Sequence, residues 1–68
     1  MNHTSTDPAC AMLKYFEFEH LPEHLQPVSS RFAALAQIMH DEVPAGPEKT
    51  MGMRKLLEAK DCMVRAAL

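Results

Sequence analysis

The sequence has no tryptophan, only two glycines and two cysteines, and no apolar run near the roughly 20 residues that a membrane span needs. Residues 1–8 are polar, and no apolar stretch of signal-peptide length follows them. Cys10 and Cys62 stand far apart in no recognisable spacing, so one disulfide is possible, but two free cytosolic thiols are favoured. We therefore expect a cytoplasmic protein that does not associate with membranes.

Positive charge is scarce as well. Seven Lys and Arg residues stand against nine Asp and Glu, which gives a formal net charge of −2. Proteins that bind duplex nucleic acid need a basic face that releases counterions, and Arg31 is the only Lys or Arg of the first predicted long helix. The composition therefore excludes duplex nucleic acid as a partner. It leaves room for a small anion, which two or three cations and free backbone N–H groups can hold.

The apolar spacing predicts an all-α fold. A first helix is expected over residues 27–42, begun by Pro27 or capped instead by Ser29 or Ser30. Its apolar residues recur three or four apart on one face: Val28, Phe32, Leu35, Met39 and Val43. Residues 43–47 break this helix, and Pro47 begins a second one over residues 47–67. A loop this short makes the two helices an antiparallel hairpin.

The residues before the hairpin are harder to interpret. Residues 1–11 are expected to form a weakly ordered arm, and residues 12–26 an aromatic arm that is either extended or a single helical turn. The alternation of residues 15–20 suits an extended segment, and the residue before Pro22 is pushed the same way. The 68 residues would then form one domain with four segments: 1–11, 12–26, 27–42 and 47–67.

The hairpin carries more apolar surface than it can bury. The second helix has two adjacent stripes, one of Met53, Leu57, Val64 and Ala67, and one of Leu56, Ala59, Met63 and Ala66. A hairpin buries one stripe per helix. If the other stripe stayed in contact with water, the fold would lose on the order of 5–10 kcal/mol of burial free energy, which is comparable to the whole stability of a small domain. We therefore predict a homo-oligomer with Met39, Met53 and Met63 in the core. The alternative is that residues 12–26 cover a single wide stripe.

The chain shows no readable catalytic set. No spacing ties its cysteines, histidines and tyrosine into a nucleophile, base and orienting group, so we expect neither an enzyme nor a cofactor. His20 and His24 have metal-ligand spacing for a helix, but Pro22 lies between them and no third ligand is convincing, so no metal site is predicted. The aromatic residues Tyr15, Phe16 and Phe18 form either a hydrophobic lid over the hairpin or a platform on which bases stack.

Residues 48–59 resemble the second long helix of a phage protein family, which reads Glu-x-[Ser/Thr]-x-Ala-Leu-x-Lys-Leu-x-Glu-Ala before small residues. The matching residues are Glu48, Thr50, Lys55, Leu56, Glu58 and Ala59, with Gly52 and Met53 where the family often has Ala-Leu and Cys62 where it often has Trp. Residues 16–22 are similar to the family's Phe-x-Tyr-His-x-Pro arm, with Phe18 replacing the tyrosine and His20 displaced by one position. The chain thus resembles the anti-CBASS cyclic-oligonucleotide sponges.

The resemblance implies a function. Members of that family form oligomers, typically hexamers, of a short N-terminal segment and two antiparallel helices. They bind cyclic di- and trinucleotides between subunits without degrading them, which blocks cyclic-oligonucleotide-based antiphage immunity in the host cytoplasm. The resemblance implies these site residues: Phe16 and Phe18 against bases, His20 and Pro22 in the pocket wall, Arg31 on a phosphate, and Arg65 on a second one. The rival interpretations are an oligomeric phage or mobile-element regulator that acts through protein–protein contacts, and an enzyme that degrades the nucleotide.

Overall fold

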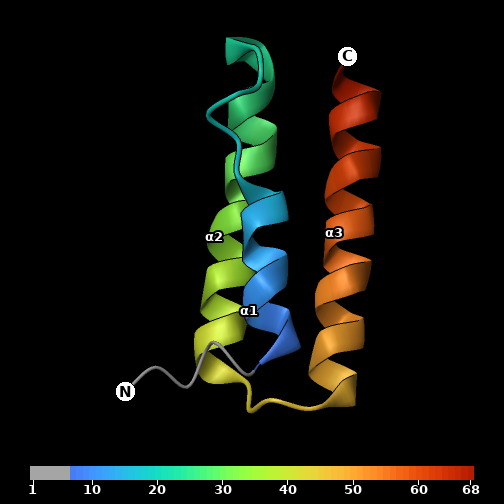
Figure 1. Cartoon of the computed structure of the whole chain (residues 1–68). Coiled ribbons are helices and arrows are strands. Elements are labelled where there is room, and N and C mark those ends of the chain that lie inside the picture. The colour runs from blue at the N-terminus through green and yellow to red at the C-terminus, as the bar shows by residue number, and fades with distance from the viewer. Residues whose placement is uncertain (1–6) are drawn as a thin grey trace.

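A computed structural model describes residues 7–68, and this part of the chain contains helices and no strand (Figure 1). The prediction of an all-α fold is confirmed. The helices expected over 27–42 and 47–67 are present as α2, Gln26–Glu42, and α3, Pro47–Ala67. Three short elements precede them: α1, Pro8–Met12, and the 3-10 helices η2, Leu13–Phe16, and η3, Glu23–Leu25. No helix among the described residues is long and apolar enough to cross a membrane.

Prolines begin both long helices. Pro27 is the second residue of α2 and Pro47 is the first residue of α3, where a missing N–H costs no helical hydrogen bond. The two serines proposed as alternative caps lie inside α2 instead. Ser29 is completely buried, and the Ser30 hydroxyl donates to the Pro27 carbonyl at 3.2 Å. Of the two ways to begin this helix, the structure therefore uses the proline.

The N-terminal segment is more ordered than the sequence suggested. The backbone N–H of Ala9 donates to the Asp7 side chain at 3.0 Å, and Pro8 follows this cap at the first helical position. Helical turns therefore occupy residues 8–16, where we expected a weakly ordered arm followed by an aromatic arm. Residues 1–6 of the expected arm lie outside the described part of the chain.

The short helix α1 makes the hairpin a small three-helix arrangement. It packs against α3 and runs parallel to it, and η2 continues in the same direction along α2, antiparallel to that helix (Figure 1). The core consists of Ala9, Phe16, Ala36 and Met53, with partly buried side chains packed around them: Met12, Leu13, Phe32, Ala33, Met39, Leu56 and Leu57. Ala9 of α1 and Ala36 of α2 are fully buried, and their small side chains let the neighbouring elements approach closely.

This third element changes which side of α2 faces inward. The buried residues of α2 are Ser29, Ala36 and His40, whereas Leu35 and Val43 of the predicted stripe are exposed. The reason is that α2 packs against η2 and η3 as well as against α3. The buried residues of α2 are therefore shifted around the helix, to one side of the predicted apolar stripe.

The N-terminal segment covers part of the surplus apolar surface of the hairpin, as expected if residues 12–26 cover a wide stripe. It does not cover all of that surface. Several large apolar side chains stay exposed: Tyr15, Leu35, Ile38, Val43, Met51, Met63 and Leu68. Within the single chain Met53 is buried and Met39 packs against the core, whereas Met63 is 54% exposed, so the burial of Met63 in a homo-oligomer stays a prediction. Met63 lies near the C-terminal end of α3, beyond the reach of the short helix α1.

Candidate functional site

The predicted site residues other than Phe16 lie toward one end of the bundle. The chain turns there between η2 and α2, and antiparallel packing returns the last turn of α3 to the same end (Figure 1). We call this part, residues 17–31 with the last turn of α3, the arm end. It carries Phe18, His20 and Pro22 in the turn, Arg31 in α2 and Arg65 in α3. The fold thus brings to one end residues that are up to 47 positions apart in the sequence.

Phe16 does not belong to an accessible surface. Its side chain is 1% exposed and lies in the core, so its ring is covered by protein on both faces. The expected contact of Phe16 with a base is therefore corrected: this residue anchors the arm, as the lid interpretation required. The neighbouring Phe18 is only half-buried, and it lines a hollow of about 150 Å³ together with Leu13, Phe16, Glu17, Glu19, Ala33 and Gln37.

A tight turn presents the polar part of the arm. The Leu21 N–H donates to the Phe18 carbonyl at 3.0 Å, which closes residues 18–21, and His20 and Pro22 are exposed on this turn. The Gln26 side chain donates to the carbonyls of Glu19 at 3.3 Å and Leu21 at 3.0 Å. Within residues 7–68, no three His, Cys, Asp or Glu side chains are close enough to hold a metal ion.

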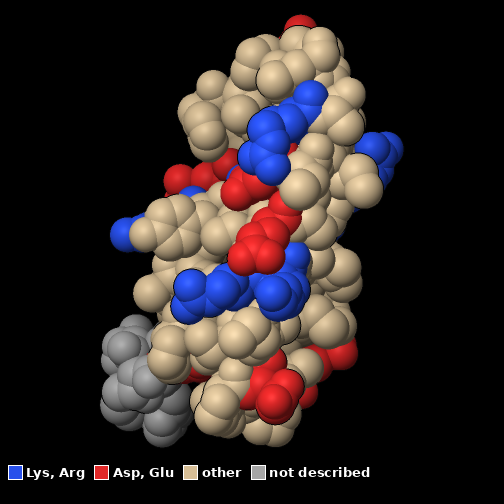
Figure 2. Space-filling model, turned by 90° about the vertical axis from the view of Figure 1, so that its right-hand side faces the viewer, with Lys and Arg blue, Asp and Glu red and all other residues tan. Residues whose placement is uncertain are grey.

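The two arginines of the arm end are exposed. Arg31 donates to the Pro27 carbonyl at 3.2 Å, and Arg65 donates to the Cys62 thiol sulfur at 3.4 Å. Among the described residues neither arginine is paired with a carboxylate. Other cations on α3 do have acidic neighbours, such as Lys60 with Asp61 at 2.9 Å. Figure 2, viewed from the side of α3, shows basic and acidic groups alternating, without a continuous basic area.

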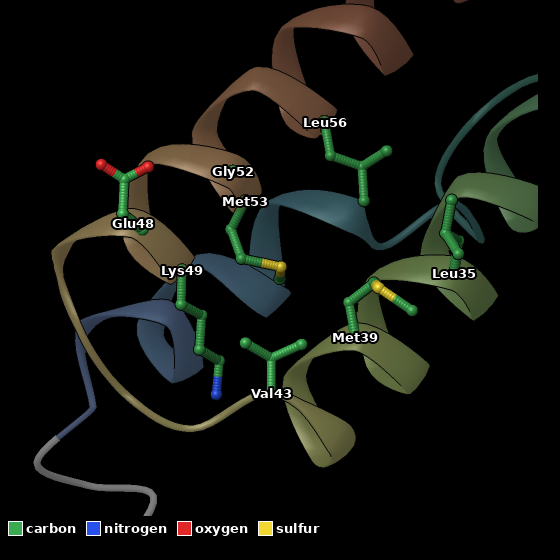
Figure 3. Close-up of a pocket in the computed structure, with 8 residues that line it drawn as sticks. All are labelled: Leu35, Met39, Val43, Glu48, Lys49, Gly52, Met53 and Leu56. Atoms are coloured by element: carbon green, nitrogen blue, oxygen red, sulfur yellow. The ribbon is translucent and has the colours of Figure 1, made fainter.

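A groove opens between the two long helices on the side away from α1. Its walls are Leu35, Met39 and Val43 from α2 and Gly52, Met53 and Leu56 from α3, with Glu48 and Lys49 at one end (Figure 3). We call these residues the apolar groove, and its volume is about 370 Å³. Gly52 adds no side chain to it, and a Cβ atom there would meet nothing within 4 Å. An exposed apolar surface of this kind is typical of a site that contacts a partner.

A buried ion cluster lies at the opposite end from the arm. Asp7, His40 and Lys49 come from the starts of α1 and α3 and from the end of α2. The Lys49 ammonium donates to the Asp7 carboxylate at 2.8 Å and to the His40 carbonyl at 2.9 Å. The hydrogen bond from Lys49 is the main reason that the pKa of Asp7 is lowered, although desolvation opposes it. The Asp7 carboxylate accepts from the Ala9 N–H and from Lys49, and Lys49 also donates to the His40 carbonyl. The cluster therefore joins α1, α2 and α3.

This cluster was not predicted from the sequence. Two signals could have indicated it: Asp7 directly before Pro8 is a helix-start pattern, and Lys49 lies four residues before the buried Met53, on the same face of α3. Comparisons with known protein families, curated proteins and solved structures found no match to this chain.

Proposed function

We propose that this chain forms a homo-oligomer, a hexamer, which binds and sequesters cyclic di- and trinucleotide second messengers without degrading them. The consequence would be to block cyclic-oligonucleotide-based antiphage immunity in the host cytoplasm. The observation that carries the proposal is the arm end: the turn that contains Phe18, the start of α2 with Arg31 and the last turn of α3 with Arg65 lie toward the same end of the bundle (Figure 1). Within residues 7–68, neither arginine is paired with a carboxylate. This arrangement agrees with the roles that the resemblance implies for Phe18, His20, Pro22, Arg31 and Arg65.

Exposed apolar side chains, in the apolar groove and outside it, support the oligomer. Leu35 is 43% exposed and Ile38 is 47% exposed on α2, and Met63 lies exposed on α3. Burial of each large side chain contributes about 1.5–3 kcal/mol, and a stable interface needs about 800 Å² from each partner. The bundle is 37 Å long and 23 Å across, so one of its long faces is large enough to supply that area.

The arm end supports an anionic, aromatic ligand. Stacking of a base on an aromatic ring contributes about 1–3 kcal/mol and tolerates different bases, and Phe18 offers such a ring. Arg31 lies in the second turn of α2, near backbone N–H groups that favour an anion. A cyclic oligonucleotide repeats its phosphates, which suits a pocket in which symmetric subunits each contribute one copy of a cation. Arg65 is the candidate for the second phosphate site.

Calorimetry with cyclic di-AMP and a cyclic trinucleotide tests the ligand. We expect Phe18→Ala to weaken binding by about 5- to 150-fold, since the lost stacking energy is about 1–3 kcal/mol. The matched control is Tyr15→Ala, because Tyr15 is an exposed aromatic residue of the same segment that lies outside the proposed site. Equal affinity of the wild type and Phe18→Ala rejects the stacking role, and no binding by the wild type rejects the ligand. Recovery of intact nucleotide after denaturation distinguishes sequestration from degradation.

The second candidate is a small helical oligomeric regulator that acts by protein–protein contacts. The apolar groove favours it too, because this surface needs only a protein partner. Thermal unfolding separates the two functions. A cyclic nucleotide at roughly 100 times its Kd adds about 2.7 kcal/mol to the stability of a sponge, and it adds nothing to a regulator that does not bind it.

A further inference from the structure

We infer that Gln26 is a positioning residue, whose side-chain amide holds the turn of residues 18–21 in the shape that presents Phe18 and His20. Its consequence for binding rests on the function proposed above. The position of Gln26 explains why it can do this. It is the first residue of α2, so its backbone is held by the helix while its half-buried side chain reaches back toward the arm.

Apart from Gln26, the hydrogen bonds that the described residues make within this turn are local: the Phe18 N–H donates to the side chain of Glu19, the next residue, at 3.4 Å. Residues 17–22 lie between η2 and η3, and one backbone hydrogen bond, from the Leu21 N–H to the Phe18 carbonyl, closes the turn. The amide nitrogen of Gln26 has two hydrogens. It donates to the Glu19 carbonyl at 3.3 Å and to the Leu21 carbonyl at 3.0 Å, one on each side of His20. A single side chain thus bridges both halves of the turn to α2.

This bridge matters for affinity because a binding segment that is ordered beforehand loses less conformational freedom when the ligand arrives. Phe18 and His20 lie in the bridged turn, and Gln26 itself need not contact the ligand. Without the amide, the turn would keep its sequence and its aromatic ring but not its fixed shape. We therefore expect weaker binding with little change in the stability of the bundle, whose core is formed elsewhere.

The experiment compares three variants. Gln26→Met keeps the length of the side chain and removes both donors, while Gln26→Lys restores donors at the same place. Ser30→Ala is the matched control, because its hydroxyl bonds only the Pro27 carbonyl inside α2 and does not reach the arm. For each protein we would measure hydrogen exchange of the Leu21 amide without ligand, the affinity for cyclic di-AMP, and the thermal midpoint.

We expect Gln26→Met to speed Leu21 exchange and to weaken cyclic di-AMP binding by about tenfold, as two hydrogen bonds are lost. Gln26→Lys should restore much of the Leu21 protection and of the cyclic di-AMP affinity. Ser30→Ala should leave the exchange rate and the affinity unchanged. Unchanged Leu21 exchange in Gln26→Met overturns the positioning role. Faster exchange with full affinity overturns its consequence for binding. If the wild type does not bind, the proposed function fails, and the exchange rates still decide whether Gln26 holds the turn.

Discussion

The carboxylate of Asp7 lies 2.8 Å from the ammonium of Lys49, 42 positions further along the chain. The two side chains are only 10% and 5% exposed, and Lys49 also donates to the His40 carbonyl. This pair joins the start of α1 to the first turn of α3. It therefore holds the N-terminal segment against the hairpin at the end opposite the arm.

Replacing Lys49 should destabilise the fold. Lys49→Met leaves the Asp7 carboxylate enclosed without its cation, and loss of one partner of a buried pair costs far more than loss of an exposed one. We expect the thermal midpoint to fall on the order of 10 °C. Lys55→Met is the control, because the contact of Lys55 with Glu58 is 3.9 Å long and both side chains are mostly exposed. Equal midpoints for the two variants in a calorimetric scan would contradict a stabilising role for the buried pair.

The same pair should make stability depend on pH in acid. The hydrogen bond from Lys49 lowers the pKa of Asp7 below its ordinary value of 3.8. A lowered pKa means that the folded state holds the proton less readily than the unfolded state. This contribution is therefore present above pH 3.8 and is lost as the pH falls through the lower folded value.

Asp7→Asn tests this dependence, because asparagine can still cap α1 but carries no charge. The difference in thermal midpoint between the wild type and Asp7→Asn should shrink as the pH falls below about pH 4. Midpoints that stay the same distance apart down to pH 2 would show that the charge of Asp7 contributes nothing.

In the proposed homo-oligomer, the subunits are expected to meet at the apolar groove. Leu35→Glu places a charge on the wall of the groove, and burial of an unpaired charge in an interface is costly. The mass measured by light scattering should fall toward that of a single chain at micromolar concentration. The matched control is Met51→Glu, since Met51 is as exposed as Leu35 but lies outside the groove. An unchanged mass for Leu35→Glu would place the subunit contacts elsewhere.

Arg31 is expected to contribute to ligand binding through its charge. Charge-assisted hydrogen bonds to phosphate are about twice as strong as neutral ones, so Arg31→Ala should weaken cyclic di-AMP binding by about tenfold or more. Arg54→Ala is the control, because Arg54 is an exposed arginine on α3 outside the arm end. The salt dependence of the affinity should also become shallower in Arg31→Ala. An affinity equal to that of Arg54→Ala would remove Arg31 from the site.

The sequence by itself determined the helical class and, apart from Gln26 at the start of α2, the limits of the two long helices. Pro27 and Pro47 start them, and apolar residues recur every three or four positions along them, so the information lies within a few neighbouring residues. It also determined that the hairpin has more apolar surface than one pair of stripes can use. Leu35, Ile38 and Met63 remain exposed in the folded chain.

Only the tertiary structure decided which stripes face inward and what the N-terminal segment does. Docking of α1 and η2 turned Ser29, Ala36 and His40 of α2 toward the core, and it placed Phe16 inside. The pairing of Asp7 with Lys49 likewise depends on three helix ends meeting in space. The physical reason is that helix formation is governed by local contacts. Which of two adjacent apolar faces is buried depends instead on where α1 and η2 pack against the long helices. These contacts join residues that are far apart in the sequence.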